Sequence, residues 1–241
     1  IPACDRGQKV ILAEQGPRLG GLLRFTDVDT DKPDLMNFKN LLVREVERRD
    51  IDVRLNTVIT PENITAFGPD GGIFATGSLP TCPPVPGIGH AHKAMDMYDG
   101  KVKPGHKIVM VGGGLVGVEV ANHLASLLKE VTVVEMRDGI ALDEGPAPRK
   151  DLLQDLANNG AKAYTSTTVD EITDHSVIVS GAHNEEIPAD TVVLAIGRVS
   201  NTALAEELTA AGVDVRIIGD AKEPGLAGAA IREGYLLGRH L

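Results

Sequence analysis

Short apolar runs alternate with longer amphipathic stretches along the chain. Such runs predict strands at residues 9–14, 51–55, 72–75, 107–111, 131–135, 191–196 and 215–218. Apolar residues at helical spacing predict helices at 35–49, from about 115 to 129, at 149–159 and at 229–240. Residues 22–34 lack periodicity and are expected to form a loop, and 162–188 are expected to form a small antiparallel element. This alternation predicts an α/β fold with parallel sheets.

A proline-rich stretch at residues 80–87 is typical of a linker and separates two similar halves. The segments KVILAE at 9–14 and VTVVEM at 131–136 are both apolar strands that reach a glutamate. In the second copy, Glu135 follows Gly112 of a glycine-rich turn by 23 positions. The same spacing before Glu14 would place the equivalent turn ahead of residue 1, and residues 1–25 hold no GxGxxG. We therefore expect the chain to begin inside its first strand–helix–strand unit; a chance likeness of two strands is the alternative.

Composition narrows the class of protein. The chain has 241 residues, 42% of them hydrophobic and 24% charged, which is typical of folded domains. Its longest apolar run, Ile108–Val118, is short of the roughly 20 residues that span a bilayer. A net charge of −10 and only seven aromatic residues (three Tyr, four Phe) disfavour nucleic-acid binding. Two distant cysteines form no CxxC, so we expect no zinc knuckle or vicinal disulfide, and a cytoplasmic location.

The strongest chemical signal is the sequence GGGLVG, which follows a strand and opens a helix. Gly112 permits the tight turn, Gly114 lets a pyrophosphate approach the backbone, and Gly117 lets the helix pack closely on the strand. Glu135 ends the next strand, where a carboxylate accepts hydrogen bonds from ribose hydroxyls. A glycine-rich turn in an α/β core would not explain this acid. The pattern predicts a dinucleotide site, with NAD favoured because Glu135 repels a 2′-phosphate; Arg137 leaves NADP open.

Three shorter turns follow other predicted strands. They contain Thr76 and Gly77; Ala195, Ile196 and Gly197; and Gly219 and Asp220. Each is expected to lie beside a bound nucleotide, although each is also compatible with a plain glycine turn. Asp220 has two readings, as a ligand of a ribityl hydroxyl or as the cap of the following helix.

In order, the segments ATGS, GGGLVGVEVA, VTVVEM, TVVLAIGR and IIGDA resemble flavoproteins of the glutathione-reductase type. The chain most resembles, over nearly its whole length, the C-terminal region of the NADH:flavin oxidoreductase / NADH oxidase family, which includes 2,4-dienoyl-CoA reductase and trimethylamine dehydrogenase. The resemblance implies two Rossmann-like domains. A split FAD-type domain at 1–102 and 189–241 would surround an inserted NAD(P) domain at 103–188.

The resemblance also implies cofactor contacts residue by residue. The expected FAD contacts are Glu14, Arg18, Gly20, Gly21, Leu22, Thr76, Gly77, Gly219 and Asp220. The expected NAD contacts are Gly112, Gly114, Leu115, Val116, Gly117, Glu119, Glu135, Met136, Arg137, Ala195, Ile196 and Gly197. No side chain is expected to act as a catalytic acid or base or as a metal ligand, because the seven histidines lack ligand spacing. Cys82 is expected to be a small packing residue.

The implied function is a module that passes hydride from NADH to FAD, and electrons onward to an FMN and 4Fe-4S barrel domain that this sequence does not contain. Because the first GxGxxG, the barrel and the cluster cysteines are absent from the sequence, FAD binding by this chain is in question and the isolated chain is expected to be inactive. Two alternatives remain: a vestigial ADP-binding structural domain, and a fragment of another flavoprotein reductase with two dinucleotide sites.

Overall fold

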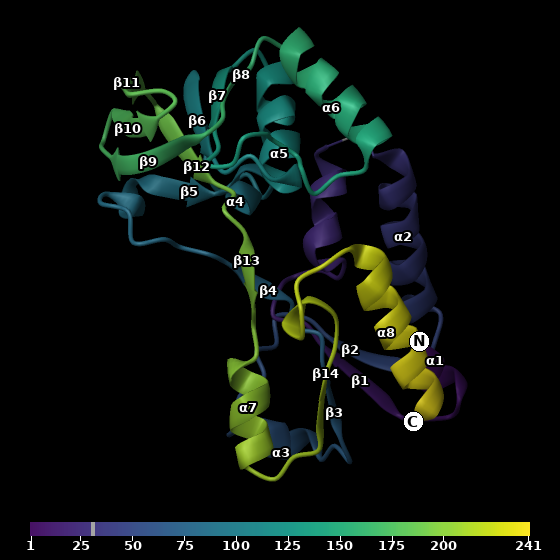
Figure 1. Ribbon diagram of the computed structural model, residues 1–241. Coiled ribbons are helices and arrows are strands. Elements are labelled where there is room, and N and C mark those ends of the chain that lie inside the picture. Colours follow the sequence, from purple (N-terminus) through teal and green to yellow (C-terminus); the bar gives the residue numbers. More distant parts are fainter. Residues whose placement is uncertain (30–31) are drawn as a thin grey trace. The chain divides into compact units, whose positions relative to one another are not determined.

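The computed structural model describes residues 1–29 and 32–241 (Figure 1). The chain divides into two compact units, each described by itself. Unit 1 combines residues 1–79 with 198–241, and unit 2 comprises residues 80–197. Across the described part of the chain, none of the helices joins the length and apolar character that crossing a bilayer requires.

Unit 2 is built on a five-stranded parallel sheet in the order β5-β12-β6-β7-β8. The strands are β5 (Ala91–Lys93), β6 (Lys107–Val111), β7 (Glu130–Val134), β8 (Lys162–Tyr164) and β12 (Thr191–Leu194). Every residue of β12 is buried, as expected for a central parallel strand with both faces covered. The expectation of a parallel sheet is therefore confirmed, and three of its strands, β6, β7 and β12, match apolar runs of the sequence.

Helices and a second sheet cover the two faces of this parallel sheet (Figure 1). The helices of unit 2 are η2 (Ile88–His90), α4 (Ala94–Tyr98), α5 (Leu115–Ser126) and α6 (Pro146–Asn158). The antiparallel sheet consists of β9 (Thr167–Ile172), β10 (Ser176–Gly181) and β11 (Glu185–Pro188). Val109 and Val111 of β6 share a buried cluster with Val177 and Val179 of β10. Side chains alternate along a strand, so Ile108 and Met110 face the other side, toward α5.

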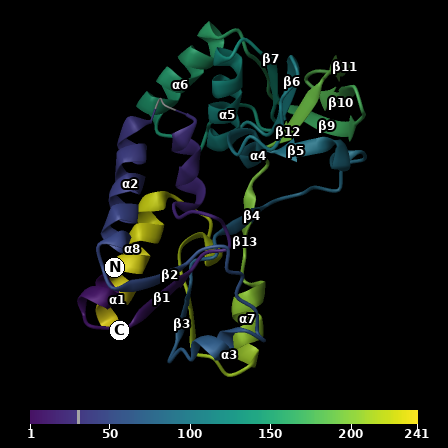
Figure 2. The same cartoon turned by 180° about the vertical axis from the view of Figure 1, so that it is seen from behind.

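The described residues of unit 1 form three two-stranded sheets. They pair β1 (Val10–Ala13) with β2 (Ile51–Arg54), β3 (Gly72–Phe74) with β14 (Val215–Ile217), and β4 (Ser78–Pro80) with β13 (Arg198–Ser200). Its helices are α1 (Pro2–Asp5), η1 (Gly21–Asp27), α2 (Pro33–Glu47), α3 (Ile64–Phe67), α7 (Ala203–Ala210), η3 (Gly219–Ala221) and α8 (Ala227–His240). A small core joins Ile64, Phe74, Ala205 and Leu208. Figure 2 shows the same arrangement from behind, with α1 again beside α8.

Three expectations from the sequence were wrong in detail. The stretch expected to be a loop contains the 3-10 helix η1, and the expectation for residues 30–31 lies outside the described residues. The antiparallel element is smaller than expected, because β8 pairs parallel with β7 at the edge of the main sheet. Cys82 is exposed and therefore does not serve as a packing residue.

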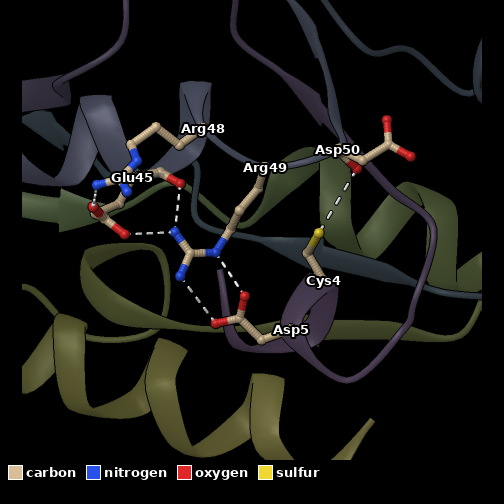
Figure 3. Close-up of polar contacts among 6 residues, drawn as sticks. All are labelled: Cys4, Asp5, Glu45, Arg48, Arg49 and Asp50. Atoms are coloured by element: carbon tan, nitrogen blue, oxygen red, sulfur yellow. Dashed lines mark hydrogen bonds and ion pairs between the residues drawn. The ribbon is translucent and has the colours of Figure 1, made fainter.

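An ionic network ties α1 to the end of α2 in unit 1 (Figure 3). The Arg49 guanidinium donates to Asp5 Oδ1 at 2.6 Å and to Glu45 Oε2 at 2.7 Å. Hydrogen bonding to Arg49 is the largest influence on both carboxyl groups and lowers the pKa of Asp5 and of Glu45. Both carboxylates are thereby held charged in the folded protein.

Candidate functional site

The glycine-rich turn after β6 is shaped by close backbone approaches. Gly112 has a φ of +105°, and a Cβ there would lie 2.5 Å from the Ala195 carbonyl oxygen. A Cβ on Gly117 would lie 2.0 Å from the Gly112 carbonyl oxygen. Gly114, in contrast, has an extended backbone (φ −65°, ψ 176°) and its Cβ position is 3.6 Å from the nearest atom, Asp143 Oδ2. Gly112 and Gly117 are thus required by packing, whereas Gly114 leaves open the space before α5.

Glu135 ends β7 and turns its carboxylate toward this turn. Its side chain is only 7% exposed. One oxygen, Oε2, accepts the Gly113 N–H at 2.7 Å, and Oε1 accepts the Arg137 N–H at 2.8 Å. The Arg137 guanidinium lies 3.3 Å from the same Oε1. Burial of a carboxylate is costly without hydrogen-bond partners, and these donors supply such partners to Glu135 beside the glycine turn.

The backbone around Glu135 forms a compact arrangement that we name the glutamate turn. The Glu135 N–H donates to the Tyr164 carbonyl at 2.9 Å, and the Glu135 carbonyl accepts the Thr167 N–H at 3.0 Å. The Ser166 N–H donates to the Arg137 carbonyl at 2.7 Å, and Ser166 has a φ of +49°. Together with the Arg137 N–H on the carboxylate, these bonds fix the glutamate at the carboxyl end of its strand.

Unit 1 contains a second glutamate turn with the same bonds. The Glu14 N–H donates to the Arg54 carbonyl at 2.9 Å, and the Glu14 carbonyl accepts the Thr57 N–H at 2.9 Å. The Asn56 N–H donates to the Gly16 carbonyl at 2.9 Å, and Asn56 has a φ of +51°. The Gly16 N–H donates to Glu14 Oε1 at 2.6 Å. The repeat seen in the sequence as KVILAE and VTVVEM is therefore a repeat in structure as well.

The other predicted NAD contacts of unit 2 are distributed around the glycine turn. Ala195, Ile196 and Gly197 follow β12, and the Ala195 N–H donates to the Val111 carbonyl at 2.8 Å. Glu119 lies half-buried on α5, one turn beyond Leu115. Val116 and Met136 are exposed to solvent, at 50% and 74%. Ala195 lies against Gly112 and Gly117, next to the start of α5, where N–H groups without a partner in the helix and the helix dipole favour an anion.

The predicted FAD contacts of unit 1 form two groups, besides Glu14. Near η1, Arg18 pairs with Asp27 at 3.0 Å, and Lys39, whose side chain is 6% exposed, pairs with the same carboxylate. Gly20 has a φ of +117° and its Cβ position lies 3.2 Å from the Lys39 side chain. Gly21 begins η1, and Leu22 is 41% exposed. In this group, therefore, Asp27 pairs with both an exposed Arg18 and a buried Lys39.

The second group joins the turns after β3 and β14. Thr76 Oγ1 donates to the Asn201 carbonyl at 2.9 Å, and the Asn201 N–H donates to the Gly77 carbonyl at 3.1 Å. Asp220 Oδ2 accepts the Ser78 hydroxyl at 3.1 Å, so the first turn and Asp220 lie together.

Two further side chains support this group. Arg198 Nε donates to Ser78 Oγ at 2.7 Å. Burial lowers the pKa of Arg198 below its ordinary value, and the charge of Asp220 opposes that shift. The Gly219 N–H donates to Glu233 Oε2 at 2.7 Å, which lowers the pKa of Glu233.

Asp220 lies in η3 and Leu226 precedes α8, so Asp220 is not the N-cap of that helix.

The donors and spaces of unit 2 fit a nicotinamide dinucleotide. The open position at Gly114, the N–H groups at the start of α5 and the carboxylate of Glu135 are what a pyrophosphate and an adjoining ribose require. In unit 1, Glu14 has the place at the end of its strand that Glu135 has in unit 2. The sequence holds a single GxGxxG, in unit 2, so unit 1 offers no glycine turn for the FAD pyrophosphate.

The family model for pyridine nucleotide-disulphide oxidoreductases matches residues 37–222, well over half of the chain. The chain belongs to this family. Its fold is the mixed α/β, parallel-sheet fold of the glutathione-reductase type that the sequence resemblance implied. Despite the family's name, Cys4 and Cys82, the two cysteines of the sequence, are both free.

Several known proteins are similar to this chain over nearly its whole length. A protein named NADH oxidase from Thermoanaerobacter brockii is 37% identical over 98% of this chain and 38% of its own length. A bilirubin reductase from Mediterraneibacter gnavus is 33% identical over 97% of this chain and 37% of its own. A 2-naphthoyl-CoA reductase structure superposes with a TM-score of 0.94 at 30% identity, covering 99% of this chain and 37% of that one. The chain thus spans less than two fifths of each of these proteins.

Some residues of the site carried no signal in the sequence. Asp143 accepts the Leu115 N–H, although 28 positions separate the two. Lys39 lies against Gly20, and Arg198 donates to Ser78, which follows Thr76 and Gly77, yet neither side chain was expected to take part in the site. These contacts arise from tertiary packing, which local spacing does not encode. Among the described residues, no group of three His, Cys, Asp or Glu side chains is arranged to hold a metal ion.

Proposed function

We propose that the chain is the pyridine-nucleotide-binding module of a flavin-dependent oxidoreductase similar to NADH oxidase, and that it binds NADH at the start of α5. The observation that carries this proposal is the meeting of the glycine turn with the buried carboxylate of Glu135. Gly114 leaves room for the pyrophosphate, and Glu135 would accept hydrogen bonds from the adenosine ribose. The names of the relatives, an NADH oxidase among them, agree with this reading.

The chain's own residues would bind and orient the nucleotide. The start of α5 would donate N–H groups to the pyrophosphate, and Glu135 would disfavour a 2′-phosphate, so NADH is proposed over NADPH. When bound, NADH supplies a hydride that a flavin accepts. Ala195 to Gly197 and Glu119 are proposed to lie toward the nicotinamide end, where they would position the ring rather than exchange protons with it.

FAD is proposed to bind in the parent enzyme at the residues of unit 1 that surround Glu14, Thr76 and Asp220. The corresponding domain limits are 1–102 with 189–241 for FAD and 103–188 for NAD(P). A further domain bearing FMN and an iron–sulfur cluster is proposed as the electron acceptor. The support is indirect: the relatives named NADH oxidase and bilirubin reductase are more than twice as long as the part that this chain matches.

Calorimetric titration of the 241-residue chain with NADH, NADPH and ADP tests the proposal. NADH is expected to bind more tightly than ADP, because nicotinamide-side contacts add to those of the adenosine and pyrophosphate. Equal affinity for NADH and ADP would reject hydride transfer and support the second reading, a vestigial ADP-binding domain. A parallel titration with FAD tests unit 1, where we expect weak binding or none.

A further inference from the structure

A side-chain carboxylate already contacts the start of α5. Both oxygens of Asp143 accept the Leu115 N–H, Oδ1 at 3.0 Å and Oδ2 at 3.1 Å. Leu115 is the first residue of the helix, and Gly114 is its N-cap. This N–H has no partner within the helix, and such N–H groups bind a dinucleotide pyrophosphate in folds of this type. Asp143 therefore places a negative charge where the ligand's phosphates are proposed to lie.

The segment that carries Asp143 is fixed by its neighbours. Ala141 is fully buried, and its N–H donates to the Gly113 carbonyl at 2.6 Å. The preceding Ile140 packs its Cγ2 2.5 Å from the Cβ position of Gly113, and its carbonyl accepts Arg149 Nε of α6 at 3.0 Å. Ile140 and Ala141 are thus anchored on the glycine turn itself. Asp143, in contrast, is exposed and can rotate away without disturbing that anchor.

Opposite charges meet in front of Gly114. A Cβ at Gly114 would lie 3.6 Å from Asp143 Oδ2 and 3.9 Å from Arg137 Nη2, so both side chains reach the same space. A pyrophosphate entering this space would gain the N–H and the guanidinium but would be repelled by the aspartate. Binding then requires that the Asp143 carboxylate leave Leu115.

We propose that Asp143 is an internal competitor of the pyrophosphate: it occupies the Leu115 N–H in the free protein and is displaced when the dinucleotide binds. The proposal rests on the proposed function of the α5 site and adds a residue that sets its affinity. Asp143 would keep the site closed to weakly held anions such as inorganic phosphate, because each must break the same charged hydrogen bond. A dinucleotide makes enough further contacts to offset the loss of the hydrogen bond between Asp143 and Leu115.

The test compares Asp143→Asn with the unaltered 241-residue chain by calorimetric titration. Asparagine keeps an acceptor for the Leu115 N–H but removes the charge. The titrants are NADH, ADP-ribose and adenosine; only the first two carry a pyrophosphate. Asp138→Asn is the matched control, since it removes one charge from an exposed residue of the same loop. Far-UV circular dichroism and thermal unfolding verify that each variant is folded.

We expect Asp143→Asn to bind NADH and ADP-ribose about fivefold more tightly, with adenosine unchanged and Asp138→Asn close to the unaltered chain. Unchanged or weaker NADH binding by a folded Asp143→Asn would overturn the proposal and leave Asp143 as a structural cap. Equal tightening of adenosine would also overturn it, because the effect would not involve phosphate. If neither chain binds NADH, the proposed function itself fails, and the competitor role fails with it.

Discussion

Gly114 and Gly117 belong to the same fingerprint, yet the structure predicts opposite consequences for an alanine at each. A Cβ on Gly117 would lie 2.0 Å from the Gly112 carbonyl oxygen, so the helix and the turn must separate by more than about 1 Å to reach ordinary contact. Overpacking of this kind costs about 1–3 kcal/mol, which lowers the Tm by roughly 2–12 °C for a chain of this size. Gly117→Ala should therefore destabilise the protein.

Gly114→Ala should leave stability nearly unchanged and weaken binding. Its backbone conformation suits any residue, and the nearest atom to the added methyl is 3.6 Å away. The poorer N-cap and the stiffer unfolded chain oppose each other, so the net change is within about 1 kcal/mol. The methyl would separate the pyrophosphate from the start of α5. Loss of one charged hydrogen bond costs about 1.5–3 kcal/mol, or roughly a ten- to hundredfold weaker NADH affinity.

The assay is thermal unfolding together with NADH titration on both variants. A Gly114→Ala chain that binds NADH as tightly as the unaltered chain would refute the placement of the pyrophosphate at this turn. A Gly117→Ala chain with an unchanged Tm would refute the packing argument instead. The two measurements separate binding from folding, because each variant is expected to change only one of them strongly.

Two further predictions concern charged groups. In Glu135→Gln, the amide can accept only one of the two backbone N–H groups that the carboxylate accepts, and it no longer repels a 2′-phosphate. The ratio of NADH to NADPH affinity should therefore fall about tenfold in parallel titrations. An unchanged ratio would contradict the role of Glu135 in disfavouring NADPH. Arg49 lowers the pKa of Asp5 and Glu45, so the stability it adds is complete above their ordinary values of 3.8 and 4.5 and is lost as the pH falls below them. Arg49→Met should therefore lower the Tm at pH 7 but much less at pH 3, whereas Arg44→Met, on the same helix, should show little pH dependence.

The sequence was most informative where local patterns determine structure. Apolar runs predicted β6, β7 and β12 of the parallel sheet, but not the three-residue strand β5 or the parallel pairing of β8. The helix expected at 149–159 is α6, which ends just before Gly160; this glycine has a φ of +76°, and the Ala161 N–H donates to the Leu156 carbonyl. The glycine fingerprint predicted the strand, turn and helix together, because Gly112 and Gly117 are required by close backbone approaches within that unit.

Long-range packing explains what the sequence did not predict. Residues 162–164 were expected to belong to an antiparallel element, but they form β8, which pairs parallel with β7. The hydrogen bond from the Glu135 N–H to the Tyr164 carbonyl extends this pairing by one residue. The contact of Asp143 with Leu115 depends on a buried Ala141 with a φ of +49°, a conformation that alanine rarely adopts and that no local rule would suggest. The cofactor roles of the named residues remain predictions.

The two glutamate turns provide an internal control for a binding experiment, because the turn in unit 1 can be compared with the turn in unit 2 in the same molecule. Their backbone bonds are equivalent, so the amide groups of Gly16 and Arg137 report on the same local environment in unit 1 and unit 2. Only Glu135 also receives an N–H from the fingerprint, at Gly113. In an amide NMR titration with NADH, a response at Arg137 without one at Gly16 would identify the occupied half of the chain. Equal responses would mean that the ligand does not distinguish a glutamate turn with a glycine fingerprint from one without it.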